Sequence, residues 1–181
     1  MIHRKIPVRG TIATPASSPP LASHGHGHPR APARVARNVS LSAGHPVTLA
    51  QLLDYQHQHN ADRVMRAGFC MIDKVQAVFT QNGFPAYIYT VKEPVAGSGR
   101  FHRVDISSRN PSDPSVTTQP FVSCSCEDFT FRCEWALANF WNMTFVRYGN
   151  GDPSDEKNPE HHPYVCKHLV AAISHLLGAV R

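Results

Sequence analysis

Acidic residues are absent from the first 53 positions of this chain, in which Asp54 is the first carboxylate. Six basic residues occupy the same stretch, namely Arg4, Lys5, Arg9, Arg30, Arg34 and Arg37. The remaining positions carry twelve basic and thirteen acidic residues, so the net charge of +5 comes from the N-terminal stretch alone. Any attraction for anionic partners is therefore expected in that one segment and not across the whole surface.

Long apolar runs are missing as well. No stretch reaches the roughly 18 apolar residues of a membrane-spanning helix, so we expect no membrane span. The basic start is not followed by the apolar core of about 7–15 residues that a signal peptide needs. An Arg-rich, acid-free start is also typical of organellar transit peptides, but the prolines here oppose the amphipathic helix of such peptides. The prolines therefore weigh against a transit peptide, and the intracellular setting that we expect rests on the cysteines.

The motifs of several common catalytic sites are also absent. The chain has no His-Glu-x-x-His, no His-x-Glu with a downstream Pro-Cys-x-x-Cys, no Gly-x-Ser-x-Gly and no phosphate-binding glycine loop. These absences favour a protein that is not an enzyme.

Proline is abundant at the N-terminus, where residues 1–46 hold seven of the 15 prolines. Such a segment buries too little apolar surface to offset the entropy lost on ordering, so we expect an extended arm. Within it, His24, His26 and His28 alternate with glycine, which favours a solvated spacer, with adventitious metal binding as the alternative. The chain therefore divides into a basic, Pro/His-rich arm, 1–46, and a domain, 47–181.

Helical periodicity marks three segments of this domain. Thr48 predicts the N-cap of a helix that runs to about Arg66. Its apolar side is formed by Leu49, Leu52, Leu53, Gln56 and Val64. A second helix is predicted by apolar spacings of four, three, four and three, at Phe129, Cys133, Ala136, Phe140 and Met143. Further apolar residues lie on another side of it, so we expect burial on most of its circumference; these are Phe131, Trp135 and Phe145. The last helix is predicted from about His168 to a stop at Gly178.

Four short strands are predicted between the first two helices, at 75–80, 85–91, 101–106 and 121–124. The Asn82-Gly83 pair is a strong signal for a tight hairpin turn between the first two. In the third strand His102, Val104 and Ile106 share one face. The expected fold is thus of the α+β class, a small antiparallel meander with helices packed around it.

The cysteines are odd in number, and the chain has five of them. Cys124 and Cys126 are too close in sequence to bridge each other comfortably, which favours a reducing compartment and metal-bound thiolates over disulfides. Two ligands separated by one residue point the same way at the end of a strand. Cys166 and His168 form a second such pair, where a loop enters a helix. We therefore predict one structural zinc ion bound by Cys124, Cys126, Cys166 and His168.

The start of the last helix favours this chemistry. Helix N-terminal N–H groups and the positive charge of Lys167 both stabilise thiolates, so zinc competes better with protons. Three thiolates and one imidazole around Zn²⁺ leave a formal charge of about −1, which these groups partly neutralise.

The pattern Cys-x-Cys, spacer, Cys-x-His resembles the SWIM zinc finger over Val122 to about Leu177. The resemblance includes Asp128-Phe129 after the paired cysteines and the segment 166–171. The 39 residues between Cys126 and Cys166 are more than is usual in that family. This long insert, with Asn158-Pro159 before the last pair, resembles uncharacterised proteins of tailed bacteriophages. The SWIM family is linked to DNA or protein binding and not to one reaction.

Other residues compete for parts of this assignment. Cys133 is an alternative ligand, but its place in the apolar series of the second helix favours a core residue, and Cys70 is interpreted as core too. His161 and His162 lie close enough in sequence to Cys166 to replace His168. A base-stacking platform is a further hypothesis for the strand aromatics Tyr87, Tyr89 and Phe101, although no basic residues interleave with the tyrosines, which favours ordinary sheet positions.

The sequence leaves two functional hypotheses. In the first, the chain is a structural component of a larger assembly, which the phage resemblance implies to be a virion, and the arm contacts neighbouring protein chains. In the second, it binds nucleic acid, and the arm contacts phosphates nonspecifically.

Overall fold

The computed structural model describes residues 41–94, 99–109, 116, 118–145, 149–150, 152–153 and 156–179. The expected arm, 1–46, lies outside these residues except for 41–46. Within residues 41–46, Leu41 is half-buried and packs against the core of the domain. The division of the chain at residue 46 therefore stays a prediction.

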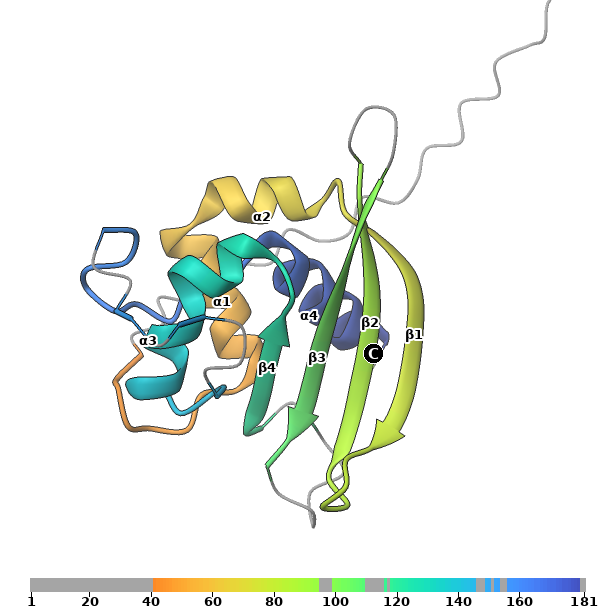
Figure 1. The fold of residues 1–181 in the computed structure, drawn as a ribbon, viewed down its shortest axis with the longest axis horizontal. Helices are drawn as coiled ribbons and strands as arrows, with labels where there is room; N and C mark the ends of the chain where they lie inside the picture. Colours follow the sequence, from red (N-terminus) through yellow and green to blue (C-terminus); the bar gives the residue numbers. More distant parts are fainter. Residues whose placement is uncertain are drawn as a thin grey trace, which may run out of the picture. The chain divides into compact units, whose positions relative to one another are not determined.

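Four antiparallel strands form one sheet in the order β1-β2-β3-β4 (Figure 1). They are β1 (Met71–Phe79), β2 (Pro85–Glu93), β3 (Arg100–Ser108) and β4 (Pro120–Cys124). Together with the helices they confirm the α+β class and the meander. The first strand begins at Met71 and not at residue 75, and a register irregularity falls between Ile72 and Lys74.

The turn between β1 and β2 is where the Asn82-Gly83 pair predicts it. The Gly83 N–H donates to the Thr80 carbonyl at 2.9 Å, and the Thr80 N–H donates to the Phe84 carbonyl at 2.8 Å. Gly83 has a φ of 77°, a conformation that glycine adopts without the steric penalty of a Cβ. This turn sets the register of the hairpin.

The first predicted helix is in fact two helices, α1 (Leu49–His59) and α2 (Ala61–Ala67). Thr48 caps α1 as expected, because its hydroxyl accepts from the Gln51 N–H at 3.2 Å and its own N–H donates to the Gln51 side chain at 2.9 Å. The prediction of one helix to Arg66 was wrong. Asn60 leaves the helical region with φ −150° and ψ 45°, which ends one helix and starts the next.

The second predicted helix is shorter than expected and begins irregularly. A π-helical turn, η1 (Phe129–Cys133), leads into α3 (Glu134–Asn139). Phe129, Cys133, Ala136 and Leu137 are buried, as an inward-facing stripe requires. The prediction that this helix is buried on most of its circumference was wrong, because Phe131 is 66% exposed.

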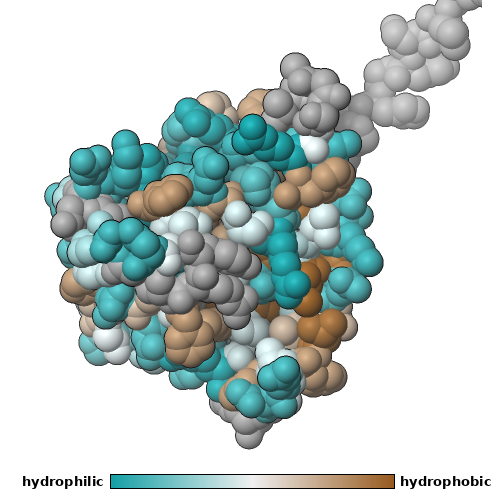
Figure 2. All heavy atoms as spheres, viewed as in Figure 1, coloured by the Kyte–Doolittle hydropathy of each residue, from teal (hydrophilic) through white to brown (hydrophobic). Residues whose placement is uncertain are grey.

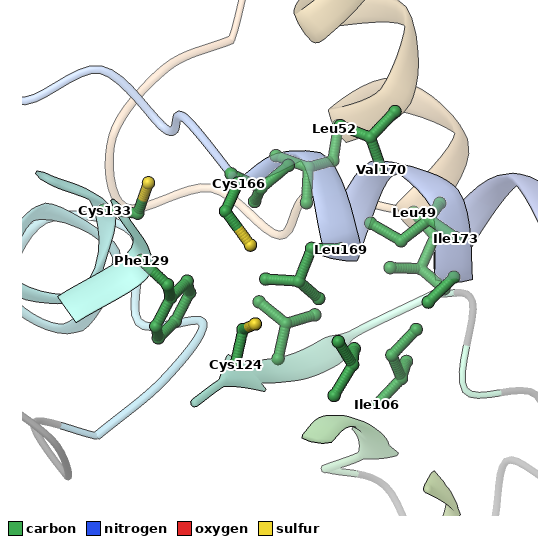
Figure 3. Close-up of a cluster of buried hydrophobic side chains, with 14 of the residues drawn as sticks. Leu49, Leu52, Ile106, Cys124, Phe129, Cys133, Cys166, Leu169, Val170 and Ile173 are labelled. Atoms are coloured by element: carbon green, nitrogen blue, oxygen red, sulfur yellow. The ribbon is translucent and has the colours of Figure 1, made fainter. Parts of the chain in front are cut away.

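The last helix, α4 (Lys167–Ala179), packs on one face of the sheet and against α1 and α2. In Figure 1 it lies behind the strands. Leu169 and Ile173 from α4 meet Ile106 from the sheet and Leu49 and Leu52 from α1 (Figure 3). This single core supports the start of α4 against the end of β4. Among the residues described, no helix has the length and apolar character to cross a membrane.

Candidate metal centre

All four predicted ligands come together where β4 ends and α4 begins. Cys124 is the last residue of β4, Cys126 follows two residues later, Cys166 directly precedes α4 and His168 lies in its first turn. All four are buried, and one potential ligand atom from each lies within 4.8 Å of the others. In Figure 3 the sulfur atoms of Cys124 and Cys166 point into the same space. We call these four side chains the sulfur cage.

The first half of the cage is held by the sheet and by η1. Cys124 pairs with Val104 on the buried face of β3. Ser125 is fixed by two hydrogen bonds with the Arg103 backbone, each 3.0 Å long. The Cys126 carbonyl then accepts from the N–H groups of Phe129 and Thr130, both at 3.1 Å. The turn between the two cysteines is thus hydrogen-bonded on both sides.

Asp128, the residue next to this turn, is anchored to the helical layer. Its carboxylate accepts from the guanidinium of Arg63 on α2 at 2.8 Å, and the Arg63 side chain is only 7% exposed. The Asp128 side chain is 40% exposed, so the pair is shielded from water on the arginine side only. The pair fixes the start of η1 relative to α2.

The second half of the cage is held by α4 and by a buried glutamine. The Cys166 carbonyl accepts from the Val170 N–H at 3.1 Å, which places Cys166 at the N-cap of α4. Gln56 on α1 is fully buried; its amide donates to the Pro163 carbonyl at 2.9 Å and accepts from the Val165 N–H at 3.3 Å. Gln56 therefore fixes the approach of the chain to Cys166.

Burial governs the protonation of the cage. It raises the pKa of the Cys124 thiol and of the Cys166 thiol well above their ordinary values. The pKa of Cys126 is lowered, chiefly because the Cys124 and Cys166 thiols donate hydrogen bonds to its thiolate. Without a cation, the lowered pKa of Cys126 favours a thiolate at that residue, and the raised pKa values of Cys124 and Cys166 disfavour thiolates there. A bound divalent cation would lower the pKa of all three thiols, because its positive charge stabilises the buried thiolates.

The donor set and spacing fit such a cation. In a tetrahedral zinc site with Zn–S bonds of about 2.3 Å and a Zn–N bond of about 2.0 Å, a sulfur and a nitrogen at neighbouring corners lie about 3.5 Å apart. The His168 Nδ1 atom lies 3.9 Å from the Cys124 sulfur, close to that value. The four side chains can therefore hold one metal ion, with Nδ1 as the imidazole donor.

A second group of side chains lies behind His168. Glu93, at the end of β2, places one carboxylate oxygen 3.6 Å from His168 Nε2 and 3.5 Å from His102 Nε2. Its other oxygen pairs with the ammonium of Lys167. The hydrogen bond from Lys167 lowers the pKa of Glu93, and burial lowers the pKa of His102.

The sequence interpretation missed this second group. The sequence placed His102 only on the same strand face as Val104 and Ile106. The available signal was a histidine that shares a face with two apolar residues. Glu93 gave none, because the predicted strand ended at residue 91.

The alternative ligands lie elsewhere. His162 accepts or donates a 2.7 Å hydrogen bond with the Tyr55 hydroxyl through Nδ1, and His161 stacks on Phe140 with ring centroids 4.6 Å apart. Neither belongs to the sulfur cage. The Cys133 thiol is buried, its pKa is raised by that burial, and it donates to the Asp128 carbonyl at 3.6 Å. Cys70 is half-buried and donates to the Arg66 carbonyl at 3.8 Å.

The hypothetical stacking platform is not formed. Tyr89 is 1% exposed and pairs with Val104, on the face that α4 covers. Phe101 pairs with Lys92 and lies on the other face. The tyrosine and the phenylalanine therefore cannot present one aromatic surface. The histidine run at 24–28 lies outside the described residues.

Comparisons with protein-family models, curated proteins and solved structures find no match to this chain.

Proposed function

We propose that the chain is a non-enzymatic, zinc-dependent interaction module in which Cys124, Cys126, Cys166 and His168 bind one structural zinc ion. The observation that carries the proposal is the convergence of four buried donor atoms from two distant segments of the chain. In this proposal, the SWIM-like ligands have a physical role: the zinc ion that they bind holds the end of β4 against the start of α4.

Zinc is the metal that this donor set favours. Three thiolates and one imidazole are soft or borderline ligands, and zinc accepts them in a tetrahedron without redox change. Four protein ligands also leave no open position for an activated water, which supports a structural role over a catalytic one.

The ion would close a long loop. Because 39 residues separate Cys126 from Cys166, ordering the two halves of the cage without a cross-link has a large entropic cost. Metal-binding energy in such sites is folding energy. The zinc ion would thus stabilise the C-terminal half of the domain, while Gln56 and the Arg63–Asp128 pair hold the segments next to it.

The test compares two buried cysteines. Purified wild-type protein should contain one zinc ion per chain by elemental analysis, and Cys166→Ser should lose it together with much of its helical circular dichroism. Cys133→Ala is the matched control, because Cys133 is equally buried but lies outside the sulfur cage. A Cys166→Ser variant that keeps full zinc content and unchanged thermal stability would refute the ligand assignment.

A protein-docking role is supported by exposed aromatic side chains. Five phenylalanines are more than half exposed, namely Phe69, Phe79, Phe101, Phe131 and Phe145. Figure 2 shows apolar side chains gathered over the sheet on the face turned to the viewer. Exposed apolar surface of this kind marks contacts with other chains. We infer that the module joins a larger protein assembly, of the virion type that the phage resemblance implies, and that the arm contacts neighbouring chains.

The alternative, nucleic-acid binding, is favoured by one observation, the absence of acidic residues before Asp54. Deletion of residues 1–46 separates the two functions. If the arm binds phosphates, affinity for DNA falls steeply with salt, and the deletion flattens that slope. If the arm contacts protein chains, the deletion leaves DNA affinity unchanged and abolishes incorporation into the particle.

A further inference from the structure

Two buried imidazole nitrogens next to the sulfur cage lack a hydrogen-bond partner among the described residues. They are Nε2 of His168, a residue only 2% exposed, and Nε2 of His102. Both face the same carboxylate oxygen of Glu93, at 3.6 Å and 3.5 Å. Burying an N–H without an acceptor costs about 1–3 kcal/mol, so the convergence of two such groups on one carboxylate needs an explanation.

A second metal ion is one explanation, and the ring geometry opposes it. The His102 and His168 rings are stacked, with centroids 4.1 Å apart and an angle of 29° between their planes. A lone pair lies in the plane of its ring, so stacked rings direct their nitrogens side by side and not toward one ion. The ammonium of Lys167, paired with the other oxygen of Glu93, would also repel a second cation.

We propose instead that Glu93 is a positioning residue for the metal ligand His168. Its carboxylate accepts the Nε2–H of His168, which fixes the tautomer whose Nδ1 lone pair is free for the metal. A closure of about 0.6 Å brings the 3.6 Å separation to an ordinary hydrogen bond of about 3.0 Å. The inference rests on the proposed zinc site and adds the group that orients its only nitrogen ligand.

The side chain of Lys167 completes the arrangement. Lys167 stands between the ligands Cys166 and His168 in sequence and holds Glu93 through its ammonium. The Glu93 carboxylate therefore contacts this segment at two residues, the ligand His168 and its neighbour Lys167. A carboxylate behind a metal-bound histidine increases the basicity of the imidazole, and its removal weakens metal binding by roughly 10–100-fold.

The test measures zinc affinity by competition with a chromophoric chelator. Glu93→Gln should bind zinc roughly 10–100-fold more weakly than the wild type. Glu127→Gln is the matched control, because it removes the same charge from an exposed side chain next to the ligand Cys126. It should bind within about twofold of the wild type, since an exposed charge is screened by water. Equal losses in both variants would show a general charge effect and overturn the positioning role.

A second readout follows the proton itself. In zinc-loaded wild-type protein, the Nε2–H of His168 should give a slowly exchanging signal in long-range ¹H–¹⁵N spectra. Lys167→Met leaves Glu93 in place but frees its carboxylate, so at saturating zinc this signal should exchange faster than in the wild type. This variant keeps the proposal testable if Glu93→Gln fails to fold.

The outcomes separate the two proposals. A wild-type chain without tightly bound zinc overturns the proposed function and this inference together. Two results would overturn this inference alone if the wild type binds zinc fully. One is a zinc affinity of Glu93→Gln within twofold of the wild type. The other is rapid exchange of the His168 Nε2–H in the zinc-loaded wild type.

Discussion

The two edges of the sheet differ sharply, although one row of side chains joins them. The row runs from Val75 on β1 through Tyr89 and Val104 to Cys124 on β4. Val75 is 39% exposed, whereas the other three are at most 1% exposed. Burial in this sheet therefore increases toward the strand that carries the sulfur cage.

The reason lies in what covers each edge. Helix α4 contacts the strands at both edges, but the β4 edge also packs against η1, and its Val122 N–H donates to the Met143 carbonyl at 2.8 Å. On β1, residues 73–77 are all exposed, and Phe79 is 77% exposed. Alternating apolar residues thus form a core only where a second layer lies above them.

Metal removal should produce the largest difference in local stability between the β4 edge and the β1 edge of the sheet. Chelation of zinc should destabilise the domain by more than about 5 kcal/mol, since structural zinc contributes roughly 10–16 kcal/mol of apparent binding energy in small domains. Backbone amide exchange should rise first in α4 and β4 and later in the β1–β2 hairpin. Uniform exchange across all four strands would show that the two edges are not distinct.

Two valines on the same row give a matched pair. Val104→Ala should lower the free energy of unfolding by about 2 kcal/mol, because it removes two buried methyl groups and leaves a cavity. Val75→Ala should change it by less than about 0.5 kcal/mol. Urea denaturation of the two variants measures both effects, and similar losses would contradict the gradient of burial.

Gln56 tests the support behind the cage. Gln56→Ala leaves the Val165 N–H and the Pro163 carbonyl without their present partner, which should cost about 1–3 kcal/mol. His57→Ala, at an exposed position of the same helix, is the control. A variant as stable as the wild type would show that the metal alone fixes the approach to Cys166.

The smallest effect is expected at the far end of β1. Phe79→Ser removes a side chain that is 77% exposed, so the free energy of unfolding should change by less than about 0.5 kcal/mol. If this edge contacts another chain, the variant should still weaken association, measured by light scattering or by incorporation into the assembly. A large loss of stability would show that Phe79 packs within its own chain.

Local chemistry made part of this structure predictable. Thr48 forms the predicted N-cap, Asn82-Gly83 forms the predicted turn, and each of the pairs Cys-x-Cys and Cys-x-His places its two donors together, because each signal acts over a few residues. The break at Asn60 and the π-helical turn at 129–133 were missed, since apolar periodicity continues through both. The approach of Glu93 to His168 depends on the packing of β2 against α4, which no local pattern encodes.

The central claim is that the sulfur cage binds zinc through three sulfurs and one nitrogen. X-ray absorption at the zinc edge of the purified protein measures this directly. We expect three sulfur neighbours at about 2.3 Å and one imidazole nitrogen at about 2.0 Å. Protein without stoichiometric zinc, or a metal surrounded by oxygen and nitrogen alone, would contradict the account.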